Sequence, residues 1–268
     1  TARLDGTFAV ALFARATETL WGARDRFGEA PLYYARQGGA IAFASRPRSL
    51  WDAPGASRRP RREYLALVAA GHYRYFDQRP DLSPYDGIAQ LPAGHILEWR
   101  AGRVNVRPYW SFEAWPEMSD DETVLAERYR SLLLDSVRVR LAGAERPAFT
   151  LSGGMDSSSV VACAATVLGA PVTAFSVVYD DPTFDERQDI RPMLDGPVGE
   201  WIPIAVGTPD VFGLVRRMIA VHDEPVATAT WLSHLLLCDE AARRGFRTIY
   251  GGLGGDELNA GEYEHFFY

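Results

Sequence analysis

Short stretches of alternating apolar and polar residues fill the first hundred positions of the chain. Four of them are rich in aliphatic and aromatic residues, lie between turn sequences such as FGEAP and QGG, and span residues 7–14, 19–25, 31–36 and 40–46. This spacing predicts an antiparallel meander. A helix is expected at 63–70, and GHILEWRAGRVNVRPYW predicts two further strands joined at an Ala-Gly turn.

The pattern changes near residues 115–119. Ser119 and Glu122 have the spacing of a capping box, and apolar residues then recur every three or four positions, which predicts a helix. Strand and helix patterns alternate from there on. The expected strands are 148–151, 172–179, 201–206 and 248–250, and the expected helices are 158–168, 210–221 and 231–244. Such alternation predicts a parallel sheet with helices on its faces, so we expect two domains of different class, 1–115 and 119–268.

The composition is that of a soluble globular protein. A chain of 268 residues with 47% hydrophobic residues can bury an ample core. The formal net charge is −7 and all 28 basic residues are arginines, so the charge balance gives no support for a nucleic-acid partner. No apolar run approaches the roughly 18 residues that cross a bilayer, so we expect a cytoplasmic protein with no membrane partner.

The two ends of the sequence predict a fragment. Thr1 lies inside a strand pattern, and the chain stops at EHFFY, an aromatic cluster that more protein would cover. We therefore expect the parent protein to extend beyond both ends.

The stretch FTLSGGMDSSSVVACAA carries the clearest chemical signal. Gly153 and Gly154 allow a tight turn that brings several N–H groups to a ligand, and the helix that follows adds its positive end. In a parallel sheet this turn lies at the edge where ligands bind, so it predicts a phosphate cradle. It lacks the lysine of a P-loop. Asp156 would repel a bare phosphate, which predicts pyrophosphate bound together with Mg²⁺.

These residues resemble a known family. SGGMDS is similar to the SGGxDS pyrophosphate loop of N-type ATP pyrophosphatases, and TIYGGLGGDELNAG resembles the S-G-x-G-x-D-E loop in the synthetase domain of the asparagine synthetase family. The segments LDGTFAVALFA, GARDRFGEAPLYYA, IAFASR and IAQLPAGHILEW resemble the latter part of that family's glutaminase domain. The resemblance covers nearly the whole chain, in the family's order.

The resemblance implies a fold for each half. Residues 1–115 would be the C-terminal part of a glutaminase-like, N-terminal-nucleophile sandwich. Residues 119–268 would be the N-terminal part of a doubly wound parallel-sheet ATP pyrophosphatase domain.

The resemblance also implies a reaction and its residues. The family uses ATP to convert a carboxylate into an acyl-adenylate, releases pyrophosphate, and lets an amine displace AMP. The pyrophosphate-binding residues would be Ser152, Gly153, Gly154, Ser157 and Ser158. The nucleoside contacts would be Leu151, Val177, Gly251 and Gly252. Asp156 and Asp256 would hold Mg²⁺, and Asp223 and Glu224 lie in a segment similar to one near the family's acceptor substrate.

One departure from the family leaves the product open. Leu253 stands where asparagine synthetases commonly have a glutamate and β-lactam-forming relatives a tyrosine, and an aliphatic side chain cannot do acid-base work. Asparagine formation with glutamine as donor is one alternative. Amide or lactam formation on another small-molecule or peptide carboxylate, as in β-lactam synthetases and lasso-peptide cyclases, is the other, and a homodimer is compatible with either.

Further residues of the family's machinery have no counterpart in the sequence. The glutaminase cysteine would precede Thr1, Cys163 and Cys238 fall in expected helices, and a lysine of the family would follow Tyr268. We assign no catalytic residue and expect these 268 residues alone to be inactive. A tRNA-modifying enzyme with the same loop is disfavoured by the acidic charge. A non-catalytic scaffold is disfavoured because Asp156 and Asp256 are both retained.

Overall fold

The computed structural model describes residues 4–70, 79–111, 118, 121–207, 209–226 and 228–259. The chain forms two compact units. Unit 1 comprises Thr1–Glu117 and Phe212–Ala229, and unit 2 comprises Met118–Val211 and Thr230–Tyr268. The chain first passes from unit 1 to unit 2 between Glu117 and Met118, and of residues 115–119 only Met118 is described. The structure differs from the predicted 119–268 domain because Phe212–Ala229 belongs to unit 1.

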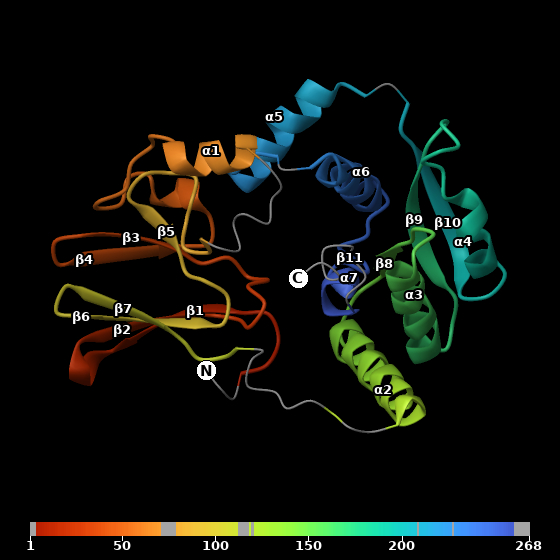
Figure 1. Ribbon diagram of the computed structural model, residues 1–268, viewed down its shortest axis with the longest axis horizontal. Helices are drawn as coiled ribbons and strands as arrows, with labels where there is room; N and C mark the ends of the chain where they lie inside the picture. Colours follow the sequence, from red (N-terminus) through yellow and green to blue (C-terminus); the bar gives the residue numbers. More distant parts are fainter. Residues whose placement is uncertain are drawn as a thin grey trace. The chain divides into compact units, whose positions relative to one another are not determined.

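Unit 1 contains two antiparallel sheets (Figure 1). One has the order β1-β2-β6-β7, with β1 Ala9–Ala14, β2 Thr19–Arg24, β6 His95–Arg100 and β7 Arg103–Pro108. The other has the order β4-β3-β5, with β4 Ala40–Ala44, β3 Tyr33–Gln37 and β5 Ile88–Gln90. Unit 1 also contains helix α1 (Arg62–Ala70) and the 3₁₀ helices η1 (Arg15–Thr17) and η2 (Pro47–Leu50).

The two sheets of unit 1 pack face to face. Leu32, Leu91 and Leu97 are buried between them, and partly buried side chains of both sheets pack against this cluster. The hairpin between β6 and β7 turns at Ala101 and Gly102, both with positive φ, as the Ala-Gly turn predicted. The predicted layered sandwich is therefore confirmed.

A buried charged pair organises the turn after β2. The Asp25 carboxylate, 2% exposed, accepts hydrogen bonds from the backbone N–H groups of Phe27, Glu29 and Ala30 at 2.9–3.1 Å. The neighbouring Arg24 guanidinium donates to the carbonyl oxygens of Ala30, Leu91 and Gly28. Because both charges are satisfied by backbone groups, the pair fixes the path of the chain from β2 into β3.

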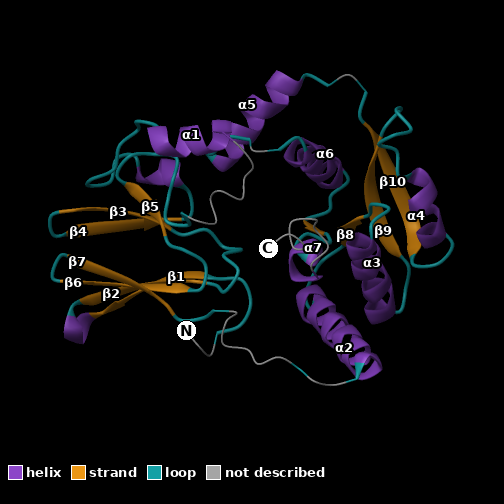
Figure 2. Cartoon of the chain, viewed as in Figure 1, coloured by secondary structure: helices purple, strands orange, loops and turns teal. Residues whose placement is uncertain are grey.

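Unit 2 is built on a parallel sheet of order β10-β9-β8-β11 (Figure 2). Its strands are β8 Pro147–Thr150, β9 Val172–Val178, β10 Val198–Ala205 and β11 Thr248–Tyr250. Its helices are α2 Glu122–Leu141, α3 Met155–Leu168, α4 Arg187–Leu194, α6 Thr230–Arg243 and α7 Gly255–Asn259. Helix α5 (Val211–His222) has its first residue in unit 2 and the rest in unit 1.

Helices cover both faces of this sheet. One hydrophobic cluster joins β8 and β9 to α2, α3 and α4 through residues such as Val137, Val161 and Ile190. A second cluster joins Phe175 of β9 to Leu237 and other residues of α6. The predicted doubly wound parallel sheet is therefore confirmed.

Several element boundaries differ from the sequence prediction. Helix α3 begins at Met155, not at Ser158, because Gly154 adopts the extended N-cap conformation. Helix α2 has Asp121 as its N-cap, whose carboxylate accepts from the Thr123 N–H at 2.9 Å, while Ser119 of the expected capping box lies outside the described residues. Helix α4 was not predicted because it is short and contains Pro192.

We predict that Asp25→Ala lowers the free energy of unfolding by about 3 kcal/mol, because it leaves several buried N–H groups without an acceptor. Urea unfolding measures this change. Asp52→Ala is the matched control, since the Asp52 side chain is 86% exposed and its ion pair with Arg58 contributes little. Equal stability of the two variants would contradict the role given to Asp25.

Candidate functional site

Two glycine loops meet at the topological switch point of the unit 2 sheet. The chain runs outward from β8 through β9 to β10 and then returns to place β11 on the other side of β8. In open α/β sheets, ligands bind beyond the carboxyl ends of the strands at such a reversal. The first glycine loop (residues 151–154) follows β8 and leads into α3. The second glycine loop (residues 251–254) follows β11 and leads into α7.

The second loop packs directly on the first turn of α3. A Cβ atom on Gly252 would lie 2.5 Å from the Ser157 backbone nitrogen and 2.6 Å from the Asp156 carbonyl carbon. A Cβ atom on Gly255 would overlap the Asp156 carboxylate. Only glycine permits this approach, so the glycine spacing of GGLGGDE is explained by contact with α3. Asp256, the next residue, is exposed.

Serine hydroxyls close the first glycine loop on itself. The Ser152 N–H donates to the Ser157 hydroxyl at 3.0 Å, and the two hydroxyl oxygens are 2.9 Å apart. The Gly154 N–H donates to the Ser152 hydroxyl at 3.3 Å, and the Ser158 N–H donates to the Gly154 carbonyl. Ser157 is 7% exposed. Its hydroxyl therefore holds the loop in shape, and direct binding of pyrophosphate by Ser157 and Ser158 stays a prediction.

A glutamate that no sequence motif singled out contacts the same loop. The Gly153 N–H donates to the Glu186 carboxylate at 3.0 Å. Glu186 is the N-cap residue of α4, and a Cβ atom on Gly153 would lie 2.5 Å from the Asp189 Cβ. Helix α4 thus packs against the backbone of Gly153. The contact joins residues 33 positions apart, a distance over which no local pattern gives a signal.

Of the residues expected at the nucleoside, Leu151 has both of its backbone polar groups engaged within the protein. The Leu151 side chain is 3% exposed, its N–H donates to the Phe175 carbonyl at 2.9 Å, and its carbonyl accepts from the Ser176 hydroxyl at 2.6 Å. Val177, one residue before the end of β9, packs in the α6-side cluster. Gly251 abuts the Thr150 hydroxyl. Contacts of these residues with a nucleoside stay a prediction.

The acidic residues near the loops fit a magnesium ion bound with phosphate. The described side chains contain no group of three or more histidines, cysteines, aspartates or glutamates that could hold a metal by themselves. Mg²⁺ at phosphate sites takes one or two carboxylates and completes its shell with phosphate and water oxygens. Asp156 in the first turn of α3 and Asp256 in α7 are two carboxylates of the kind that such an ion takes. That they bind one Mg²⁺ ion together stays a prediction.

Apolar side chains stand out at the mouth of the two loops. Met155, the first residue of α3, and Leu253 in the second loop are each 83% exposed. Leu253 lies between the glycines that contact α3. The second glycine loop therefore carries an exposed aliphatic side chain.

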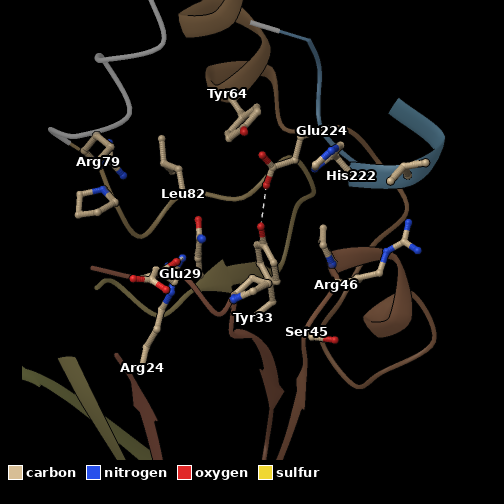
Figure 3. Close-up of a pocket in the computed structure, with 16 residues that line it drawn as sticks. Arg24, Glu29, Tyr33, Ser45, Arg46, Tyr64, Arg79, Leu82, His222 and Glu224 are labelled. Atoms are coloured by element: carbon tan, nitrogen blue, oxygen red, sulfur yellow. Dashed lines mark hydrogen bonds between the residues drawn. The ribbon is translucent and has the colours of Figure 1, made fainter. Parts of the chain in front are cut away.

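Unit 1 contains a separate polar cavity of about 540 Å³. Figure 3 shows Glu224 and Tyr64 on one side of it and Tyr33 on the other. The Tyr33 hydroxyl donates to the Glu224 carboxylate at 2.6 Å. The arginines of its wall are already engaged: Arg24 by backbone carbonyls, Arg46 by Asp223, and Arg79 by Glu63 and Asp81.

Asp223 has a structural role that explains why Phe212–Ala229 lies in unit 1. Its side chain is fully buried and forms ion pairs with Arg46 at 2.9 Å and Arg48 at 2.6 Å. The Arg46 guanidinium also donates to the Ala220 carbonyl. Of the two acidic residues singled out in this segment, Asp223 therefore clamps the end of α5, and Glu224 faces the cavity.

Burial and charge perturb two phenols of this cavity. Desolvation, followed by the charge of Glu224 and a hydrogen bond with it, raises the pKa of Tyr33 and of Tyr64 well above the ordinary value near 10. Both phenols therefore keep their protons in the folded protein at pH values where they would lose them in the unfolded chain.

Within the part of the chain that the structure describes, no helix has the length and apolar character needed to span a membrane.

Comparison with known families identifies the chain. A family model described as asparagine synthase matches residues 128–268, more than half of the chain, and one described as glutamine amidotransferase domain matches residues 1–110. A glutamine-amidotransferase segment thus precedes a synthase segment. The chain belongs to the asparagine synthase family, which confirms the resemblance found in the sequence.

Curated relatives match along nearly the whole chain. Glutamine-hydrolyzing asparagine synthetase 3 of Bacillus subtilis (strain 168) is 27% identical over 277 residues, 96% of this chain and 44% of the relative. Amidase chyE of Penicillium rubens is 27% identical over 278 residues, 96% of this chain and 40% of the relative. The chain therefore spans less than half the length of these relatives.

Solved structures give a weaker likeness. An NH3-dependent NAD synthetase from Campylobacter jejuni is 19% identical with a TM-score of 0.35, covering 50% of this chain and 59% of that chain. A glutamine-dependent NAD+ synthetase from Acinetobacter baumannii is 18% identical with a TM-score of 0.38, covering 67% of this chain and 33% of that chain.

We predict that Gly252→Ala lowers the free energy of unfolding by about 2 kcal/mol, because the new methyl group would press on backbone atoms at the start of α3. Thermal and urea unfolding measure the loss. Gly196→Ala is the control, since a Cβ atom there meets nothing within 4 Å. A stable Gly252→Ala variant would show that the two loops are not in contact.

We also predict that stability falls as the pH rises through about 10. For Tyr33 and Tyr64 together, the unfolded chain then binds up to two protons fewer than the folded protein, which costs up to about 1.4 kcal/mol per pH unit for each phenol. The pKa values of other groups, namely Tyr34, Tyr85, Tyr109, Cys163 and Cys238, are raised by desolvation and add to the same slope. Urea unfolding between about pH 9 and 11 should show a slope that Tyr33→Phe and Tyr64→Phe each reduce. The sequence has no lysine to obscure this range. An equal reduction by Tyr129→Phe, at a 53% exposed residue, would contradict the assignment.

Proposed function

We propose that the intact protein is an ATP-dependent ligase that forms an amide bond through an acyl-adenylate and releases AMP and pyrophosphate. The observation that carries this proposal is the meeting of the two glycine loops around Asp156 at the switch point of the parallel sheet. This is the edge of the fold where nucleotides bind. Membership of the asparagine synthase family supports the same reaction class.

The residues divide the work as follows. The N–H groups of Ser152, Gly153 and Gly154, which are hydrogen-bonded within the protein in the free chain, exchange those partners for the pyrophosphate, and the first turn of α3 adds its positive end. Asp156 and Asp256 would hold Mg²⁺, which would supply positive charge at the pyrophosphate. Backbone groups at Leu151, Val177, Gly251 and Gly252 bind the nucleoside. The α-phosphorus stays open to in-line attack by the carboxylate.

The acid and the amine differ between two candidate functions. The first is asparagine synthesis with glutamine as amide donor, which the family and the relative from Bacillus subtilis favour. The second is amide or lactam formation on another carboxylate. Leu253 favours this second candidate, because its exposed aliphatic side chain offers neither acid-base chemistry nor a hydrogen bond to incoming ammonia.

ATP–pyrophosphate exchange by the intact protein tests the common step. We expect exchange in the presence of the acid substrate, and we expect Asp156→Asn to reduce its rate at least about 100-fold through loss of the metal ligand. Asp135→Asn, on the exposed surface of α2, is the control for a change of charge. Release of ADP and phosphate would refute adenylation, and an absence of exchange with every acid tested would favour a non-catalytic scaffold.

A further inference from the structure

The first glycine loop already holds an anion. Three successive N–H groups of the loop are satisfied within the protein: those of Ser152 and Gly154 by neutral serine hydroxyls, and that of Gly153 by the Glu186 carboxylate at 3.0 Å. Hydrogen bonds to a charged acceptor are the stronger kind. The charged oxygen of Glu186 is thus the acceptor for the N–H of Gly153, the first of the two glycines in the loop.

The Glu186 carboxylate comes from the start of helix α4 but does not cap that helix. Glu186 is the N-cap residue of α4, but its side chain makes no capping hydrogen bond to its own helix. Its carbonyl accepts from the N–H groups of Asp189 and Ile190, and Ile190 is 1% exposed in the core that includes Leu151. The backbone of Glu186 is therefore fixed by packing, whereas its side chain is free to change rotamer.

The charges around Glu186 disfavour a second anion beside it. The preceding Asp185 forms an ion pair with Arg187, whose guanidinium also donates to the Tyr179 carbonyl. That arginine is therefore already committed. A phosphate oxygen that took the Gly153 N–H would stand next to the Glu186 carboxylate, and two like charges at hydrogen-bond distance repel each other strongly.

We propose that the Glu186 carboxylate is a displaceable occupant of the anion cradle, which holds the Gly153 N–H until the phosphates of ATP take its place. This inference rests on the proposed function. Glu186 keeps the loop N–H satisfied in the free protein and weakens the binding of any phosphate ligand by the energy of its own contact. It acts on the phosphate part of the ligand and leaves the nucleoside part unaffected.

Calorimetric titration of the intact protein with ATP and Mg²⁺, with pyrophosphate and Mg²⁺, and with adenosine tests the proposal. Glu186→Gln retains an oxygen that can accept from Gly153 and removes the competing charge. We expect this variant to bind ATP and pyrophosphate about three- to tenfold more tightly than the wild type and adenosine equally well. Glu186→Ala should give the same direction, and thermal unfolding confirms that both variants are folded.

Asp181→Asn is the matched control, since Asp181 is an exposed acid in the same segment that accepts from the Thr183 N–H. Unchanged or weaker binding of ATP by Glu186→Gln, or equal tightening by Asp181→Asn, would overturn the proposal while wild-type binding of ATP keeps the proposed function standing. If the wild type binds neither ATP nor pyrophosphate, the proposed function itself fails, and the role of Glu186 fails with it.

Discussion

The contact between the second glycine loop and the first turn of α3 is the constraint on which the candidate site depends. It brings together two segments about a hundred residues apart in the sequence, at backbone distances that no side chain larger than hydrogen allows. Because β8 and β11 are adjacent parallel strands, the same contact fixes where both loops leave the sheet. The position of Asp156, the shape of the serine-closed loop and the start of α7 all follow from it.

Local patterns in the sequence predicted the elements well and their tertiary contacts poorly. Strand alternation and turn residues locate the first four strands, since these signals arise within a few neighbouring residues. The predicted meander of these strands is wrong, because β1 and β2 pair in one sheet and β3 and β4 in the other. The start of α3 was predicted three residues late because Gly154 carries no side chain that marks a cap. The contact of Glu186 with Gly153 joins residues 33 positions apart, and the contact of Asp223 with Arg46 joins residues 177 positions apart. Local periodicity in the sequence does not predict contacts over such separations.

The motifs were nevertheless sufficient to predict the family and the edge of the parallel sheet at which the candidate site lies. SGGMDS and GGLGGDE both follow strands and lead into helices, as their resemblance to the family implied. The glycines, however, also have a packing role in this structure. Gly252 and Gly255 allow close contact with the start of α3 and Gly153 allows close contact with α4, while the N–H groups of Gly153 and Gly255 are hydrogen-bonded within the protein. A motif interpreted only as a ligand-binding signature misses this packing role of its glycines.

The passage of Phe212–Ala229 through unit 1 means that neither unit is a contiguous piece of sequence. The chain passes between the units three times. The buried carboxylate of Asp223, in the segment Phe212–Ala229, forms ion pairs with Arg46 and Arg48, which are encoded far upstream. A single recombination crossover at any point between Arg48 and Asp223 would leave that carboxylate without its two arginines. The segment that carries Asp223 is therefore expected to be inherited together with the first part of unit 1, although a long stretch of unit 2 lies between them in the chain.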